Sequence, residues 1–462
     1  MPGLSSRLGL AIALLAMLAI YFVTQVEVRV DPRPRGSVAE IGALAGRTDL
    51  NVLFILVDTL RADRLAANGY RRATSPGLDY LASSGVRFTN HHAQSSWTKA
   101  SMASLWTGLY PHRTGVTRAT DGLSSQARVP AEIFREAGYV TIGMWRNGWV
   151  APNFGLGQGF EIYQSPLPGQ IPDSLRRKVR AGRIEGTDVD LVFSAMEFLR
   201  THRDQRFFLY IHMMDVHQYV SDAETAIFGT TYTDSYDNAV LWVDTQVRAI
   251  IGELERLGLR EHTLIALASD HGEAFGEHGR EGHARDLHTE VIQTPFILSL
   301  PFILDPGVVV DSPTANVDIW PTILELVGLP VLPLAEGRSR VPEILGRAIE
   351  GAADQQPDFA QLDRTWGKVR KKPAPIVAVR RGSHRLIHDV VGAQRDTLYD
   401  LASDPLGLLD IAEANPEITQ QLTLEIERYL ERGVVWNEGA PRVELEDMQL
   451  NQLRALGYAI EQ

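Results

Sequence analysis

The chain has 462 residues, a hydrophobic content of 44% and a formal net charge of −12, and it contains no cysteine. This length suffices for one large α/β domain with an appendage, or for two or three ordinary domains. The acidic balance argues against a nucleic-acid partner, and the missing cysteines exclude disulfides, thiolate metal sites and a cysteine nucleophile.

The amino terminus carries an uncharged apolar run, LGLAIALLAMLAIYFVTQV, at residues 8–26. Its length is close to the roughly 20 residues that cross a bilayer as a helix. The run exceeds a signal-peptide core and no clear cleavage site follows it, which favours a retained anchor over residues 1–28. Arg7 before it favours a cytoplasmic amino terminus, so the body would be periplasmic or extracellular. Residues 29–48 mix proline, glycine and charge and predict a linker.

Continuous apolar runs of strand length recur along the body and predict buried strands. Helical patterns separate most of them, which predicts an α/β fold with a doubly wound, mostly parallel sheet flanked by helices. The runs lie at residues 51–58, 140–145, 207–215, 263–270 and 295–300.

Three of these runs end in an aspartate: Asp58, Asp215 and Asp270. Ligands of open α/β sheets bind beyond the carboxyl ends of the strands, so the three carboxylates could converge on one site. Each aspartate could equally cap the helix or turn that follows it.

Histidines and carboxylates gather after one of these strands, in SDHGEAFGEHGREGH at residues 269–283. Adjacent carboxylate and imidazole groups, as in Asp270 and His271, are ligands of divalent ions such as Zn²⁺, Mn²⁺ or Mg²⁺. A second group, His212 and His217 in HMMDVH, could be one core and one surface histidine. Together with His271 and His283, it indicates a site that handles an anion.

The stretch SSWTKASMASLWTG, residues 95–108, predicts a polar turn followed by a helix. Ser95 or Ser96 would cap this helix and Thr98 would lie in its first turn, where unpaired N–H groups favour negative charge. Thr98 could then be a nucleophile beside a cation, or it could be the helix cap itself.

Several motifs, taken together and in order, resemble the sulfatase family of the alkaline phosphatase superfamily. The resemblance implies a catalytic domain at residues 49–345, then a smaller C-terminal α+β subdomain with a helical tail at 346–462. The motifs are NVLFILVDTLRAD, SSWTKASMASLWTGLYPHRTGV, TLIALASDHGEAFGEHG, VDIWPTILELVG and TLYDLASDP.

The resemblance places Thr98 where the family has the residue that is converted to formylglycine. Threonine carries a methyl group on Cβ, so its oxidation would give a ketone, and no formylglycine is expected. The Asp270-His271 pair is similar to the threonine-nucleophile branch, which includes phosphoethanolamine transferases, lipoteichoic acid synthases and phosphodiesterases. The spacing from His212 to His217 and from His271 to His283 also matches phosphoethanolamine transferases.

The resemblance implies roles for individual residues. Asp58, Thr98, Asp270 and His271 would bind one divalent ion, Zn, Mn, Mg or Ca, with a transition metal favoured by the imidazole. Thr98, His217 and His283 would be catalytic, and the two histidines could instead hold a second metal. The expected substrate-binding residues are Lys99, His212 and Arg61.

These features predict a membrane-anchored hydrolase or transferase that acts on a phosphate monoester or diester. The alternatives are a sulfuric ester hydrolase and an inactive module that binds anions. The anchor favours an anionic ester substrate of the cell envelope, such as a lipid head group or a glycan.

Overall fold

The computed structural model describes residues 31–166, 186–347, 356–368, 370–392 and 394–445. The expected anchor, residues 1–28, lies outside these ranges, and no helix within them is long and apolar enough to cross a membrane. The chain divides into two compact units, Met1–Arg33 and Pro34–Gln462, and the helices and strands of the described residues lie in the second.

An eight-stranded sheet forms the centre of this unit, in the order β11-β2-β10-β7-β1-β6-β4-β5. All neighbouring strands pair in parallel except β10, which runs against both β7 and β2. The mostly parallel sheet is therefore confirmed, and the run at 295–300 supplies its reversed strand. The bounds are β1 (Asn51–Val57), β2 (Val86–Phe88), β4 (Val140–Trp145), β5 (Ile162–Gln164), β6 (Phe207–Met213), β7 (Thr263–Ala268), β10 (Phe296–Ser299) and β11 (Val308–Val310).

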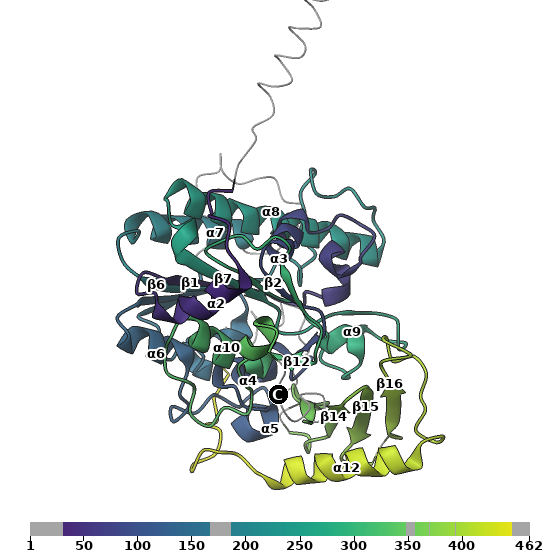
Figure 1. Ribbon diagram of the computed structural model, residues 1–462. Helices are drawn as coiled ribbons and strands as arrows, with labels where there is room; N and C mark the ends of the chain where they lie inside the picture. The colour runs from purple at the N-terminus through teal and green to yellow at the C-terminus, as the bar shows by residue number, and fades with distance from the viewer. Residues whose placement is uncertain (1–30, 167–185, 348–355, 369, 393, 446–462) are drawn as a thin grey trace, which may run out of the picture. The chain divides into compact units, whose positions relative to one another are not determined.

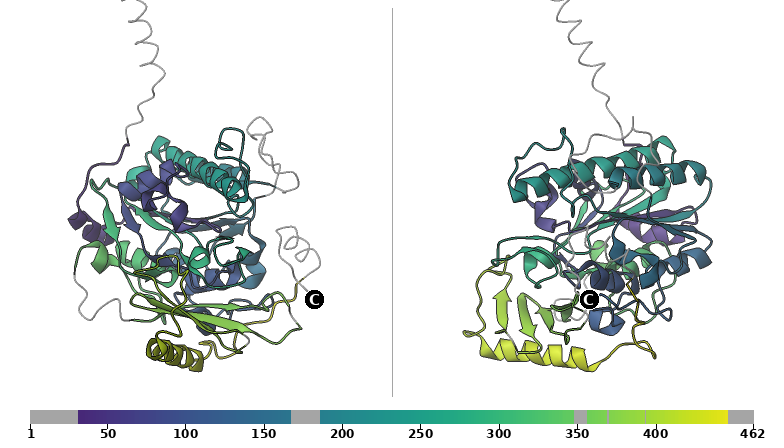
Figure 2. Two further views of the ribbon diagram at one scale, coloured as in Figure 1. Left: turned by 90° about the vertical axis from the view of Figure 1, so that its right-hand side faces the viewer. Right: turned by 180° about the vertical axis from the view of Figure 1, so that it is seen from behind.

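Helices cover both faces of the sheet (Figure 1, Figure 2). One layer contains α3 (Pro76–Ser83), α7 (Asp188–Thr201) and α8 (Tyr232–Arg256), and the other contains α4 (Thr98–Thr107), α6 (Pro130–Glu136) and α10 (Ile319–Leu326). The strand β1 is buried throughout because its side chains alternate between the two layers. Leu53 and Ile55 enter the core of the first layer, whereas Phe54 contacts Trp106 of α4 and Trp320 of α10.

A second sheet, antiparallel and four-stranded, follows in the order β13-β14-β15-β16. Helix α12 (Pro416–Glu431) packs on it through Leu422, Ile426 and Tyr429 (Figure 1). This sheet and helix agree with the α+β character expected of the C-terminal subdomain, and the domain boundaries stay a prediction. The strands are β13 (Asp358–Asp363), β14 (Pro375–Arg381), β15 (His384–Asp389) and β16 (Thr397–Asp400).

Short elements complete the described part of the chain. The two-residue strands β8 (Ala274–Phe275) and β9 (Glu281–Gly282) form an antiparallel hairpin. The other short elements are α2 (Val38–Ala43), β3 (His91–His92), α5 (Pro111–Thr114), α9 (Thr289–Ile292), β12 (Thr314–Ala315) and α11 (Val341–Ile344).

The second half of the expected linker differs from the prediction, because residues from Pro34 onward pack on the unit that contains the central sheet. Ile303 N donates to Pro34 O at 2.8 Å, and Gly36 N donates to Ile303 O at 2.9 Å. Ser37 N and its hydroxyl both donate to the Glu40 carboxylate at the start of α2, which lies within this range. Ser37 and Glu40 form a capping box, which was not recognised because the surrounding sequence is rich in proline.

Candidate active site

The candidate active site lies at the carboxyl ends of four adjacent strands, β7, β1, β6 and β4. Asp58 directly follows β1, Asp270 follows β7 by two residues, and His212 lies near the end of β6. Asn147 follows β4 by two residues, and all four side chains are buried. Parallel strands gather their carboxyl ends at one edge, so residues far apart in sequence meet there.

Each of the two aspartates has one oxygen that is satisfied and one that is not. Asp58 Oδ2 accepts hydrogen bonds from Asn147 Nδ2 at 2.7 Å and His212 Nε2 at 3.0 Å. Asp270 Oδ1 accepts from the backbone N–H groups of His271 at 3.0 Å and Thr59 at 3.3 Å. Asp58 Oδ1 and Asp270 Oδ2 are buried without a hydrogen-bond partner among the described residues. Such bare carboxylate oxygens are costly unless a cation balances them.

His271 turns a ring nitrogen toward the same point. Its Nδ1 lies 3.0 Å from Gly272 O, which can only accept, so Nδ1 carries a proton and Nε2 holds the lone pair of the neutral ring. Nε2 lies 3.3 Å from Asp270 Oδ2 and 3.9 Å from Asp58 Oδ1. The ligand atoms of the three residues lie within 4.8 Å of one another. This donor set fits a divalent cation.

The two carboxyl groups differ in acidity. Burial, reinforced by the charge of Asp58, raises the pKa of Asp270 to about 7. Burial would also raise the pKa of Asp58, but the His212 hydrogen bond and the nearby imidazoles hold it well below its usual range. Two carboxylates so close resist being ionised together, and a bound cation would remove this conflict.

Thr98 directs its hydroxyl at this cluster. Thr98 Oγ1 lies 3.2 Å from His271 Nε2 and accepts from Asn147 Nδ2 at 3.3 Å. It is the first residue of α4, and its side chain is fully buried. The expected serine cap is wrong: the N-cap is Trp97, and the Ser96 hydroxyl donates to Asp286 O at 2.6 Å. Because Thr98 is the first residue of α4, its hydroxyl lies at the positive end of the helix dipole.

His217 and His283 lie beside the cluster, on its more open side. The ring centroids of His217 and His283 are 4.9 Å apart, and those of His283 and His271 are 4.5 Å apart. Both rings are half-buried, whereas Thr98 and the three ligand residues are fully buried. His283 Nδ1 lies 3.0 Å from Glu273 Oε2, which orients the ring. These two histidines are therefore more accessible to solvent than Thr98 and the three ligand residues.

The three expected substrate-binding residues lie in different surroundings. His212 joins the cluster, but its nitrogens bond Asp58 and the Tyr210 hydroxyl. Lys99 Nζ donates to Ala119 O at 2.6 Å. Arg61 pairs with Asp63 and Glu277. Neither Lys99 nor Arg61 hydrogen-bonds the metal-site residues within the described structure, so their substrate role stays a prediction.

Two details were not predicted. Asn147 bridges Asp58 and Thr98, and its position just after a parallel strand was the sequence feature that could have indicated it. Asp215, in contrast, does not reach the metal site: it accepts from Arg146 at 2.6 Å and from Trp242 Nε1 at 2.8 Å. It is a buried ion-pair partner.

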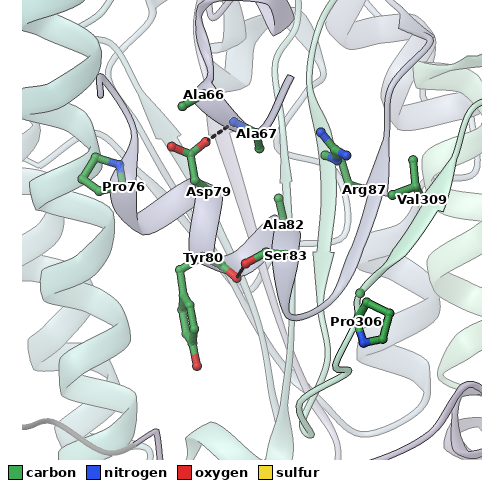
Figure 3. Close-up of a pocket in the computed structure, with 11 residues that line it drawn as sticks. Ala66, Ala67, Pro76, Asp79, Tyr80, Ala82, Ser83, Arg87, Pro306 and Val309 are labelled. Atoms are coloured by element: carbon green, nitrogen blue, oxygen red, sulfur yellow. Dashed lines mark hydrogen bonds between the residues drawn. The ribbon is translucent and has the colours of Figure 1, made fainter. Parts of the chain in front are cut away.

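A separate pocket of about 590 Å³ lies over α3 and the β2–β11 edge of the sheet (Figure 3). Asp79 points into it, and its carboxylate is already bonded by Ala67 N at 2.7 Å. Arg87, Tyr80 and Val309 are among the other lining residues, and none of the lining residues belongs to the Thr98 site.

Comparisons with known proteins identify the family of the chain. A family model described as Sulfatase matches residues 50–329, and one described as N-sulphoglucosamine sulphohydrolase, C-terminal, matches residues 276–432. Steryl-sulfatase of Rattus norvegicus is 26% identical over 406 residues, which cover 64% of this chain and 70% of that protein. Arylsulfatase K of Mus musculus is 22% identical over 442 residues, which cover 80% of this chain and 78% of that protein.

The fold is shared with solved structures. Phosphonate monoester hydrolase of Agrobacterium radiobacter superposes with a TM-score of 0.68 at 21% identity, over 86% of this chain and 100% of that one. BT1596, a 2-O GAG sulfatase, superposes with a TM-score of 0.69 at 18% identity, over 89% of this chain and 96% of that one. The family model spans more than half of the chain, which therefore belongs to the sulfatase family of the alkaline phosphatase superfamily.

Proposed function

We propose that this sulfatase-family hydrolase acts on phosphate monoesters or diesters, as a hydrolase or transferase, with Thr98 as its nucleophile. The observation that carries the proposal is the contact of Thr98 Oγ1 with both His271 and Asn147 at the positive end of α4. A hydroxyl held there is placed to act as an anion against an electrophilic phosphorus.

The chemistry of threonine favours phosphorus over sulfur. Its Cβ carries a methyl group, so oxidation cannot yield the aldehyde of formylglycine, and the chain has no cysteine to convert. A sulfated threonine also lacks the hemiacetal hydroxyl through which a formylglycine enzyme eliminates sulfate. A phosphorylated threonine needs no such route, because water or an acceptor hydroxyl can attack the phosphorus.

The cluster offers a place for a divalent cation at Asp58, Asp270 and His271, with Thr98 Oγ1 beside it. When bound, the cation would supply positive charge that lowers the hydroxyl pKa and neutralises the substrate anion. Asn147 positions both Thr98 and Asp58, and His212 holds Asp58. His217 and His283 would bind the oxygens of the transferring group. A transition metal is favoured over calcium because one ligand is an imidazole.

The reaction proceeds in two displacements. First, Thr98 Oγ1 gives up its proton and bonds to phosphorus, while the bond from phosphorus to the leaving oxygen breaks and that oxygen takes up a proton. Second, a water or acceptor hydroxyl loses a proton and bonds to phosphorus, and Thr98 Oγ1 leaves and is reprotonated. The net change is hydrolysis or transfer of the phosphoryl group.

Sulfate ester hydrolysis is the second candidate, because the matched relatives include proteins named steryl-sulfatase and arylsulfatase K. An inactive anion-binding module is the third candidate. The intact set of Asp58, Thr98, Asp270 and His271 argues against it.

A parallel assay distinguishes these candidates. Nitrophenyl phosphate, bis-nitrophenyl phosphate and nitrophenyl sulfate are offered to the wild type and to Thr98→Val and Thr98→Ser, with Zn²⁺, Mn²⁺ or Ca²⁺ added. We expect phosphoester turnover that Thr98→Val lowers by about 10³-fold and that Thr98→Ser largely retains. Sulfate release with little phosphoester turnover would favour the second candidate, and no turnover with no bound metal would favour the third.

We further propose that residues 1–28 tether the catalytic unit to a membrane, outside the cytoplasm, where lipid head groups or glycans are the substrates. The uncharged run at residues 8–26 supports this placement. Membrane fractionation of the full chain and of a chain that begins at Pro34 tests it. We expect the full chain in the membrane fraction and the shortened chain in the soluble one; a soluble full chain would contradict the tether.

A further inference from the structure

Three of the four described non-glycine residues with positive φ lie within two residues of a member of the site, and the fourth is Leu334. The described non-glycine residues with positive φ include Thr59 at 61°, Tyr219 at 55° and Ala284 at 58°. Thr59 follows Asp58, Tyr219 lies two residues after His217, and Ala284 follows His283. A bulky residue in this region is an outlier, and such strain persists where the surrounding structure and the function require it. Tyr219 carries out no step of the proposed reaction, so its strained placement calls for another role.

Tyr219 forms one half of a tyrosine pair outside the two histidines. Its ring stacks on Tyr232, the first residue of α8, with centroids 5.2 Å apart and an interplanar angle of 27°. The Tyr219 hydroxyl donates to the Tyr232 hydroxyl at 2.8 Å. Tyr232 keeps 40% of its surface exposed, although it also packs against Phe275 at 5.4 Å. The pair thus offers aromatic surface to solvent.

The pair is rigidly connected to the nucleophile end of the sheet. Tyr219 contacts Tyr236 edge-on at 5.9 Å, and the Tyr236 hydroxyl donates to Thr59 O at 2.7 Å. The same hydroxyl accepts from Arg61 N at 2.9 Å. The backbone directly after Asp58 therefore fixes Tyr236, and Tyr236 supports the tyrosine pair.

Arg285 supplies an exposed positive charge on the segment that follows the β8–β9 hairpin. It lies two residues after His283, on the exit from the β8–β9 hairpin whose Phe275 touches Tyr232. Its side chain is exposed and has no hydrogen bond or ion pair within the described part of the chain. Burial raises the pKa of Tyr232, and the Arg285 charge lowers it. The hairpin contact and this charge effect together associate the guanidinium with the tyrosine pair.

We propose that Tyr219, Tyr232 and Arg285 form a leaving-group subsite that binds a ring carrying a second negative charge. The inference rests on the proposed function, since it names the part of the ester that departs from Thr98. Tyrosine faces stack on aryl rings and on the C–H faces of sugar rings. A guanidinium without a partner binds a carboxylate, sulfate or phosphate on such a ring.

Matched substrate pairs test the subsite. One pair is phenyl phosphate and 4-carboxyphenyl phosphate, and the other is glucose 1-phosphate and glucuronic acid 1-phosphate. Within each pair the two members differ in one carboxylate, and the two pairs separate an aryl source from a sugar source. If the wild type cleaves only sulfate esters, the corresponding sulfates replace the phosphates.

We expect Arg285→Gln to lower kcat/KM for the charged member of at least one pair by about tenfold, and to leave its uncharged partner within about twofold. Arg280→Gln removes an exposed arginine from the turn between β8 and β9, five residues before Arg285, and should leave both members unchanged. Tyr219→Leu and Tyr232→Leu should lower kcat/KM for ring esters by about fivefold relative to methyl phosphate. Tyr80→Leu, an exposed tyrosine of α3, is their control.

The results separate the two proposals. Turnover of both members with an unchanged preference in Arg285→Gln would overturn the subsite and leave Thr98 chemistry standing. Equal losses in Arg285→Gln and Arg280→Gln would also overturn it, because they would indicate a general charge effect. Absence of turnover by the wild type on every phosphate and sulfate ester would instead contradict the proposed function.

Discussion

At the level of single residues, the defining feature of the site is a pair of buried carboxylate oxygens without hydrogen-bond partners among the described residues. In Asp58 and Asp270, one carboxylate oxygen accepts hydrogen bonds from protein donors. The other oxygen of each residue has no such bond and lies within 3.9 Å of His271 Nε2. Two ionised carboxylates in so small and dry a space repel each other. The local energetics therefore favour a bound cation.

The variant Asp270→Asn tests whether Asp270 is a ligand of a divalent cation. Removing one anionic ligand should weaken binding of Zn²⁺ or Mn²⁺ by at least about 100-fold, measured by calorimetry on metal-stripped protein. Asp244→Asn is the matched control, because Asp244 is a buried carboxylate bonded to Gly77 and Leu78 of α3 instead. Equal metal affinity in wild type and Asp270→Asn would exclude Asp270 as a ligand.

The sequence alone identified residues of the site better than it identified their contacts. Asp270 and His271 are adjacent and stand in a histidine-rich motif, so their pairing was predictable. Asn147 was missed because a polar residue after a strand is common, and only the sheet order, with β4 next to β6, brings it to Asp58. Lys99 adjoins Thr98 in sequence, but its ammonium lies 4.0 Å from the Phe154 ring centroid, a contact that depends on distant chain segments.

At the scale of elements, His278 joins the segment between β8 and β9 to a loop of the C-terminal region. Its Nδ1 lies 2.7 Å from Glu290 Oε1, and its Nε2 lies 2.8 Å from Gly407 O. Both partners are acceptors, so the geometry requires a doubly protonated ring. The ring also stacks on His288 with centroids 3.7 Å apart.

This contact predicts a pH dependence of stability. Burial lowers the pKa of His278, but the Glu290 hydrogen bond, Gly407 O and the nearby carboxylates outweigh it, so the pKa is raised above its ordinary ~6.5. A raised pKa means that the stabilisation is fully present below the unfolded value and is lost as pH rises through the folded value.

The measurement compares the Tm of wild type and His278→Gln across pH. We expect the wild type to exceed the variant most at acidic pH, and the difference to shrink as pH rises past the folded pKa. A difference that grows with rising pH would contradict the protonated contact. His202→Gln, at the half-buried C-cap of α7, serves as the control.

Secondary-structure elements were predicted where burial requires a recognisable pattern of apolar residues. The strands β1, β6 and β7 are buried on both faces and appear as unbroken apolar runs. The antiparallel direction of β10 could not be predicted, because a strand buried on both faces has the same composition in either direction. Helix α2 was missed because Pro32 and Pro34 dominated the local composition.

At the scale of the whole molecule, a metal at the strand ends should stabilise the fold. Its three ligands come from the segments after β1 and β7, which unfolding separates, so the cation binds the native state preferentially. Free metal at about 100 times its Kd should add about 2.7 kcal/mol. Removal by a chelator should therefore lower the Tm of the wild type.

The same chelator should have little effect on Asp270→Asn, whose site no longer binds tightly. Scanning calorimetry of both proteins with and without chelator checks this expectation. An equal drop in both proteins would locate the stabilising metal elsewhere.

Attack of the Thr98 hydroxyl on the ester would leave a covalent phosphoryl-threonine. Rapid acid quenching during turnover of a phosphate ester, followed by peptide mass spectrometry, would detect this intermediate. We expect a phosphoryl group on Thr98 in the wild type, which accumulates when the second displacement is slow and is missing in Thr98→Val. A phosphoryl group on another residue, or undiminished turnover by Thr98→Val, would contradict it.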